Sequence, residues 1–200
     1  GIATLVLSRY HIAMNRHSPE HTAALIERIG RLVSTEAHAE GLLPVQWEAL
    51  RYLQQANRFS RTPAALTAYL GLTKGTVSQT LNALESKGLV NKQVDPKDRR
   101  SKQLSLSAKG TRLLQRDPLS ATVAAIDELG SAAQNGLNKG LRTFLTLRLT
   151  AQDRQAFGQC ADCRYFAARH PGGAPHYCGL LQEKLTAADA QAICYEQVPK

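Results

Sequence analysis

The forty residues from 71 to 110 constrain the fold more than any other part of the chain. They begin with a predicted helix, for which Thr73 suits the N-cap and Gly88 suits the C-terminal end. Apolar residues recur within it at the spacing of one helical face, at positions 77, 81 and 84. Apolar residues at 89–94 and 104–106 then predict two short strands, joined by a turn that starts at Asp95-Pro96. This order of elements is that of a winged helix.

The turn and the second strand carry the motif D-P-K-D-R-R-S-K-Q-L-S-L-S-A-K-G, from Asp95 to Gly110. This motif resembles the wing of the MarR family of dimeric bacterial transcription regulators, and the helix before it resembles that family's recognition helix. The resemblance covers most of residues 20–157 and does not extend to the C-terminal tail. It implies a mainly α-helical fold with a small β-hairpin wing, in which a helical dimerisation domain accompanies the winged helix-turn-helix.

Helix signals on both sides of the winged helix predict how the chain is organised. Ser18-Pro19, Pro44 and Thr62-Pro63 each suit the start of a helix, whereas Pro118 interrupts a helical pattern, where we expect a kink or break. A last long helix is expected from about 138 to 157. The predicted parts are N-terminal dimerisation helices (1–43), a winged helix-turn-helix DNA-binding domain (44–110), C-terminal dimerisation helices (111–157) and a metal-binding tail (158–200).

The formal net charge of +9 is concentrated on the predicted winged helix. Between Gly71 and Arg112, nine Lys or Arg stand against three Asp or Glu, a net of +6. Such a patch is typical of a phosphate-binding surface, although a solvated charged hairpin would have the same composition. No apolar run approaches the length of a membrane span, and the N-terminal residues lack the features of a signal peptide. We therefore expect a cytoplasmic protein with no membrane partner.

The predicted recognition helix has a polar outer face. With its apolar residues turned inward, steps of 100° place Gly75, Ser78, Gln79 and Asn82 on the opposite side, toward the major groove of double-stranded DNA. The amides of Gln79 and Asn82 can both donate and accept, which suits the edge of adenine. Lys74 and Thr76 in the first turn are expected to hold phosphates.

The wing carries the other candidate DNA contacts, which are Lys97, Asp98, Arg99, Arg100 and Lys102. Arginines at a wing tip suit a narrow minor groove, whose negative potential attracts guanidinium groups. The resemblance implies that Asp98 braces the inserted arginine, and the Asp-x-Arg pattern makes Arg100 the candidate for that role.

Apolar stripes on the first and last long helices indicate a further interface. One runs from Leu25 to Val33, and the other, from Leu141 to Leu149, is wider than one helical face requires. In the MarR family the corresponding helices of two subunits intertwine, so the resemblance implies a homodimer bound to a pseudo-palindromic operator. An intramolecular core would explain the same stripes.

All four cysteines lie in the last 41 residues, spaced as C-x2-C-x14-C-x15-C at Cys160, Cys163, Cys178 and Cys194. The tail from 158 to 200 is neutral, with four basic and four acidic residues, so it does not extend the basic surface. Four thiolates suit an iron–sulfur cluster or a tetrahedral zinc ion. Only one close pair is present, and no glycine follows it, which favours the cluster over a zinc ribbon. Zinc is the alternative, and metal-free thiol sensing is a third.

These features predict a DNA-binding transcription regulator, expected to be a repressor, whose iron–sulfur cluster senses redox or iron state. The alternative is the same regulator with a structural zinc tail and a small-molecule pocket between the dimer helices and the DNA-binding domain. We predict no enzymatic activity and no catalytic residues, because four cysteine ligands leave no open metal position.

Overall fold

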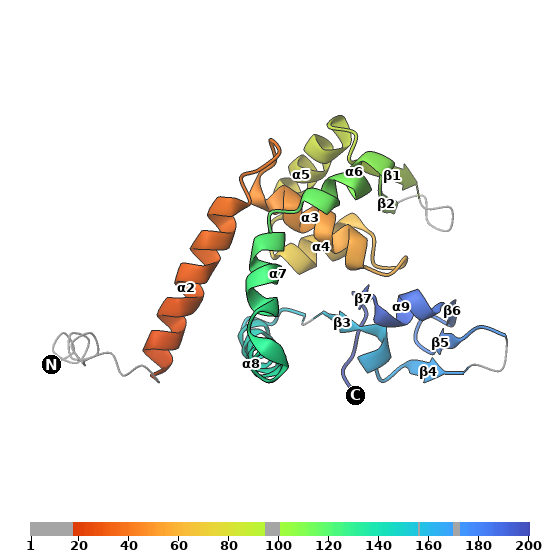
Figure 1. Ribbon diagram of the computed structural model, residues 1–200. Helices are drawn as coiled ribbons and strands as arrows, with labels where there is room; N and C mark the ends of the chain where they lie inside the picture. Colours follow the sequence, from red (N-terminus) through yellow and green to blue (C-terminus); the bar gives the residue numbers. More distant parts are fainter. Residues whose placement is uncertain (1–17, 95–100, 156, 170–172) are drawn as a thin grey trace, which may run out of the picture.

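The computed structural model of the protein describes residues 18–94, 101–155, 157–169 and 173–200 (Figure 1). The winged helix contains α3 (Pro44–Gln55), α4 (Pro63–Leu70), α5 (Lys74–Ser86), β1 (Val90–Val94), β2 (Lys102–Leu106) and α6 (Ala108–Leu113). The helices beside it are α2 (Pro19–Glu36), the 3-10 turn η1 (Leu114–Arg116), α7 (Ser120–Asp127) and α8 (Gly130–Thr150). The tail contains β3 (Gly158–Gln159), η2 (Cys160–Asp162), β4 (Phe166–Ala168), β5 (His176–Cys178), β6 (Glu183–Leu185), α9 (Ala187–Gln191) and β7 (Ile193–Cys194).

The winged helix holds the main hydrophobic core. Side chains of α3, α4 and α5 pack against one another and against the two wing strands, with Trp47, Leu66 and Leu84 fully buried. Strands β1 and β2 pair antiparallel, from Val90 opposite Leu106 to Val94 opposite Lys102. The helix, strand, turn and strand order is therefore confirmed, and the fold is mainly α-helical with a small antiparallel wing.

The expected helix ends are confirmed where local capping decides them. Thr62 and Thr73 accept hydrogen bonds from the backbone N–H three residues on, at 3.1 and 3.2 Å, and so begin α4 and α5. Gly71 and Gly88 follow these helices with φ of +65° and +69°, a conformation that glycine adopts without strain. Pro118 lies in a break between η1 and α7, as expected.

Three other helix ends differ from their expected positions. The first helix ends at Glu36 rather than near Gly41, because Ala37 and Leu42 leave it to enter the core. Helix α8 begins at Gly130 rather than near 138, since the chain after the Pro118 break regains helical structure sooner than its apolar pattern suggests. It ends at Thr150 rather than 157, and Phe157 instead packs its ring edge-on against Tyr52 and Tyr69.

Asp117 fixes the chain direction at the break between η1 and α7. Its carboxylate accepts two hydrogen bonds from Arg51 of α3, at 2.7 and 2.8 Å, and one from the Leu119 N–H at 2.9 Å. Partial burial acts to raise the pKa of Asp117, but these hydrogen bonds hold it below the ordinary value. The pair thereby anchors the start of α7 to the winged helix.

Helices α2, α7 and α8 extend away from the winged helix (Figure 1). They carry exposed apolar side chains. Among the residues that the structure describes, none in these three helices is buried. Their exposed apolar side chains include Leu25, Ile29, Leu32, Leu141, Phe144, Leu145 and Leu147. The two stripes are therefore not part of a core within one chain. No helix in the described part of the chain is long and apolar enough to span a membrane.

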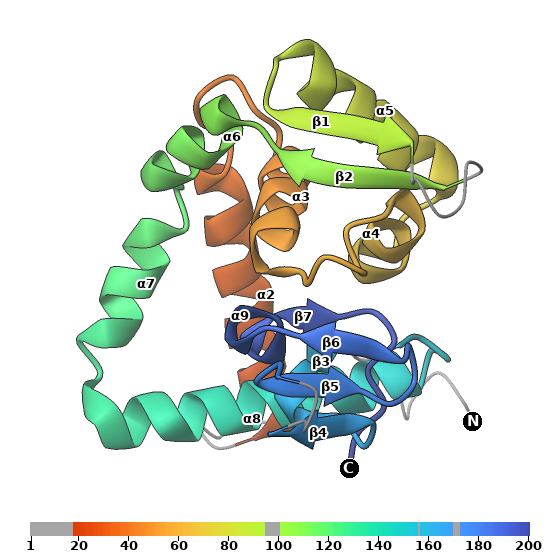
Figure 2. The ribbon, with the colours of Figure 1, turned by 90° about the vertical axis from the view of Figure 1, so that its right-hand side faces the viewer.

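The cysteine tail folds as a small unit below the winged helix and beside α8 (Figure 2). Strands β4, β5 and β6 form an antiparallel sheet, and β3 pairs with β7. An ion pair of 3.7 Å joins Arg142 of α8 to Asp162 of the tail. The tail thus contacts both the DNA-binding domain and the last long helix.

Gly110, which ends the wing motif, is predicted to tolerate no side chain. A Cβ at this position would overlap the backbone carbonyl oxygen of Leu89 and contact Leu106. We expect Gly110→Ala to lower the free energy of unfolding by about 1 to 3 kcal/mol, as overpacking does. Chemical denaturation measures this. Gly75→Ala is the control, because its Cβ would meet only Thr73 Oγ1 at 3.8 Å and should leave stability unchanged or raised. Equal free energies of unfolding for the wild type and Gly110→Ala would contradict this prediction, because they would show that α6 can move away from Leu89 without cost.

Candidate nucleic-acid interface and cysteine cluster

The exposed face of α5 is the centre of the candidate nucleic-acid interface. Val77, Leu81 and Leu84 are buried, whereas the predicted outer residues Gly75, Ser78, Gln79 and Asn82 are exposed. The orientation expected from helical stepping is therefore confirmed. Contact of these side chains with DNA stays a prediction.

A groove of about 310 Å³ lies between α4, α5 and the wing. Its lining includes three lysines, Lys74 at the start of α5, Lys92 on β1 and Lys102 on β2. The small side chains of Pro63, Ala64 and Ser78 form other parts of its wall. Because its charged groups are ammonium groups, the groove suits a polyanion.

Lys92 is part of this interface and was not expected from the sequence. Its Nζ donates to Asn82 Oδ1 at 2.5 Å and pairs with Glu85 at 2.9 Å. Lys92 thus takes one of the two lone pairs of Asn82 Oδ1. The expected use of Asn82 as both donor and acceptor toward a base stays a prediction. The sequence did not show the Lys92 contact because it depends on how β1 packs against α5.

Of the other residues predicted to contact DNA, some lie within the described part of the chain and some do not. The Thr76 hydroxyl bonds that of Thr73 at 2.9 Å, so it takes part in capping α5. Lys102 begins β2 and is exposed beside the groove. Lys97, Asp98, Arg99 and Arg100 lie outside the described residues, so the bracing of Arg100 by Asp98 stays a prediction.

The four cysteines converge on one small cavity in the tail. Cys160, Cys163 and Cys194 are buried and Cys178 is half-buried, and all four line a cavity of about 10 Å³. Phe166, Leu180, Leu185 and Glu196 complete its wall. Within the described ranges, no group of three or more His, Cys, Asp or Glu side chains is arranged to hold a metal ion as it stands. The cysteines therefore share a site, and the cofactor stays a prediction.

Each cysteine sulfur receives a hydrogen bond from an N–H group. Asn57 Nδ2 donates to Cys160 Sγ at 3.2 Å, and the backbone N–H groups of Val198 and Leu181 donate to Cys163 and Cys178 at 3.5 Å. The backbone of Glu196 does the same for Cys194. Such donors stabilise negative charge on sulfur and are typical of thiolates that bind a metal or cluster.

Cys160 and Cys194 shift each other's pKa. Their mutual hydrogen bond lowers the pKa of Cys194 and raises that of Cys160, with burial opposing the first shift and adding to the second. Of the two thiols, Cys194 is therefore the more acidic. All four cysteines are free.

The tail has little hydrophobic core apart from these cysteines. The buried residues at its centre are Cys160, Leu185 and Cys194, against which Phe59, Phe166 and Cys178 pack. A segment of this size needs a disulfide, a metal or support from a neighbour to be stable. Here it has a neighbour, because Phe59 belongs to the loop between α3 and α4.

Comparison with known proteins identifies the DNA-binding part of the chain. Residues 40–101 match the model of the MarR family. This segment of the chain is similar to the winged helix-turn-helix of the MarR family. A putative transcriptional regulatory protein for the hcr operon of Thauera aromatica is 26% identical over 132 residues, which is 66% of this chain and 75% of that protein.

Solved structures share the fold of about two thirds of this chain. Staphylococcus aureus MepR in its DNA-binding conformation gives a TM-score of 0.56 at 23% identity, covering 64% of this chain and 98% of MepR. The MepR–DNA complex gives 0.51 at 23% identity, covering 62% and 96%. That this chain is a transcription regulator without enzymatic activity stays a prediction, which the match to the MarR family supports. The match at 40–101 ends before the cysteine tail.

Proposed function

We propose that this protein is a homodimeric, sequence-specific DNA-binding repressor whose cysteine tail carries an iron–sulfur cluster that senses redox or iron state. The proposal of DNA binding rests on the exposed polar face of α5, which lies beside a lysine-lined groove within the segment that matches the MarR family. The likeness to MepR, which has been solved in complex with DNA, supports the same part. The operator is double-stranded and pseudo-palindromic, because two equivalent α5 helices would read it.

Arg100→Ala is expected to weaken operator binding by about ten- to a hundredfold, since it removes the guanidinium proposed to enter the minor groove. The slope of log affinity against log salt should fall by about 1 if a phosphate contact is lost with it. Gel shifts at several salt concentrations measure both effects.

The control for Arg100 is Arg116→Ala, which removes an exposed arginine of η1 that pairs only loosely with Glu40 at 3.6 Å. It lowers the net charge equally, so it tests for a general charge effect. Equal affinities of the two variants would contradict the role of Arg100.

The dimer is supported by the apolar stripes of α2 and α8. These helices of 18 and 21 residues bury no side chain and leave wide apolar faces in contact with water, so they require a partner surface. We assign that partner to a second copy of this chain. The intertwined helices implied by the family resemblance would cover both stripes at once.

Leu145→Glu is expected to raise the dissociation constant of the dimer roughly a hundredfold, because a symmetric interface carries the buried charge twice. Analytical ultracentrifugation measures the dissociation constant. Leu43→Glu is the control, since Leu43 is as exposed but lies outside both stripes. A Leu145→Glu protein that dimerises like the wild type would place the interface elsewhere.

The cluster proposal is supported by the convergence of four cysteines and by the N–H donors around them. The chemistry of four soft ligands in a largely apolar site fits a cluster, and it also fits zinc. The thinness of the tail's own core gives either group a stabilising role. A cluster would in addition change its charge or be lost on oxidation, which a zinc ion would not.

Anaerobic purification followed by metal and sulfide analysis tests the cofactor. We expect iron, sulfide and a brown protein that absorbs near 400 nm, and we expect Cys178→Ser to lower the metal content. A colourless wild-type protein with one zinc per chain would replace the cluster by the zinc alternative. A wild-type protein that contains no metal would leave metal-free thiol sensing as the function of the tail.

A second candidate function is suggested by a cleft of about 600 Å³ between α8 and the tail. Its walls include Tyr69, Arg142, Leu145, Phe157 and Ile193. This size and mixed lining suit a small-molecule ligand. It supports the alternative regulator, with a structural zinc tail and a small-molecule effector.

A further inference from the structure

The loop between α3 and α4, residues 56–62, joins the DNA-binding domain to the cysteine tail. The Asn57 N–H donates to the carbonyl of Ile193 at 2.9 Å, next to an isolated bridge between Ala56 and Ile193. The Tyr195 N–H donates to the Ser60 hydroxyl at 2.8 Å. The residues on both sides of Cys194 are thus hydrogen-bonded to this loop.

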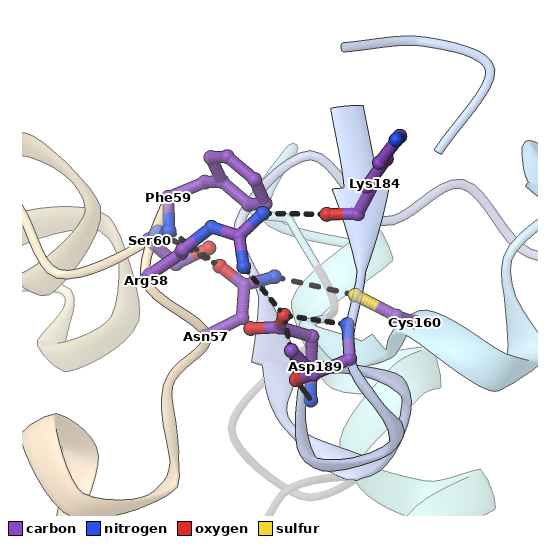
Figure 3. A network of polar contacts seen from close by, with 8 residues as sticks. Asn57, Arg58, Phe59, Ser60, Cys160, Lys184 and Asp189 are labelled. Carbon is purple, nitrogen blue, oxygen red and sulfur yellow. Dashed lines mark hydrogen bonds and ion pairs between the residues drawn. The ribbon is translucent and has the colours of Figure 1, made fainter. Parts of the chain in front are cut away.

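Asn57 is the residue of this loop that reaches the cysteine cluster (Figure 3). It is 2% exposed, and its Oδ1 accepts hydrogen bonds from the Phe59 and Ser60 N–H groups at 3.1 and 2.9 Å. Since two N–H donors point at the oxygen, turning the amide over would place its amino group, itself a donor, against both of them. Its amino group must therefore point at Cys160 Sγ, 3.2 Å away.

In this geometry, Cys160 Sγ accepts a hydrogen bond from the buried amino group of Asn57. A buried amino group without a partner is unfavourable, and its hydrogen bond is strongest when the acceptor carries negative charge, as a metal-bound thiolate does. The DNA-binding domain thereby supplies part of the surroundings of the cysteine site.

The same loop is hydrogen-bonded to the wing and to the helix-turn-helix. The Leu104 N–H of β2 donates to the Arg61 carbonyl at 2.7 Å, and the Thr62 hydroxyl caps α4. The Tyr52 hydroxyl of α3 donates to the Ser60 carbonyl at 2.7 Å. Only three residues along the chain lie between Asn57 and Arg61, whose carbonyl bonds the wing strand.

We propose that Asn57 is a positioning residue of the cysteine site and that the 56–62 loop couples the state of this site to the placement of the wing and α4. This inference rests on the proposed function, because it requires a bound metal or cluster in the tail. When the sulfurs lose their ligand or charge, the Asn57 amino group loses its best acceptor, and the loop is released from one of its fixed contacts. The wing strand and the cap of α4 then shift with it.

The test uses the full chain purified anaerobically with its metal, in wild-type, Asn57→Ala, Asn57→Asp and Arg58→Ala forms. Asn57→Asp keeps an acceptor for the Phe59 and Ser60 N–H groups but turns an oxygen toward the sulfurs. Arg58→Ala is the matched control, because Arg58 contacts the tail only at its rim, through Asp189 at 2.9 Å and the Lys184 carbonyl (Figure 3).

The first readout is the loss of bound metal to a chelator, which applies to iron and to zinc. Both Asn57 variants should lose metal about ten- to a hundredfold more readily than the wild type, as expected when a hydrogen-bond partner of a ligand is removed. Arg58→Ala should stay within about twofold, since Arg58 contacts Asp189 and the Lys184 carbonyl rather than a cysteine sulfur. Asn57→Asp keeps the loop's own hydrogen bonds, so it serves if Asn57→Ala fails to fold.

The second readout is the ratio of operator affinities between metal-loaded and metal-stripped protein, measured by gel shift. We expect a ratio of about tenfold for the wild type and Arg58→Ala, and a ratio near one for the Asn57 variants. Asn57 variants that match the wild type in both readouts would overturn the inference while leaving the metal site intact. A wild-type protein without metal would overturn the proposed cofactor and the inference together, and normal operator binding by it would leave the DNA-binding proposal standing.

Discussion

The hydrogen bonds of the 56–62 loop hold the parts of this molecule together. Asn57 and Ser60 are buried, so their polar groups need partners within the protein. Those partners come from α3, from the tail strand around Cys194 and, through Arg61, from the wing. A polar loop that is closed into the core in this way cannot move without breaking several of these hydrogen bonds together. The DNA-binding domain and the tail are thereby one hydrogen-bonded unit.

The tail depends on this loop because it cannot build a core of its own. Its buried centre consists mainly of cysteines, and Phe59 of the loop is one of the few large apolar side chains packed there. Arg58 adds an ion pair to Asp189, which also caps α9. A tail stabilised by its neighbour and by bound metal would respond to the loss of either, which suits a sensor. The same arrangement would suit a purely structural zinc site, so the identity of the metal determines whether the tail is a sensor or a structural element.

The two apolar stripes impose the other large constraint. Helices α2 and α8 leave the core in one chain with their Leu, Ile and Phe side chains exposed. Arg51 and Asp117 fix where α7 departs, and so set the direction in which α8 can meet a partner. The position of the recognition helices relative to each other would follow from this anchor. Contact between α8 and the tail, through Arg142 and Asp162, places the cysteine site beside the same helix.

The sequence by itself determined the winged helix, because caps, turn residues and apolar spacing are local signals. Thr73, Gly88 and the outer face of α5 lie where those signals place them, and the four cysteines do meet at one site. Only the tertiary structure shows which residues join the winged helix to the cysteine site. The roles of Asn57 and Lys92 arise from contacts with residues distant in the chain or on another element, and neither residue type signals such a contact. The ends of α2 and α8 moved for the same reason, since burial of Ala37, Leu42 and Phe157 in the core outweighs local helical preference.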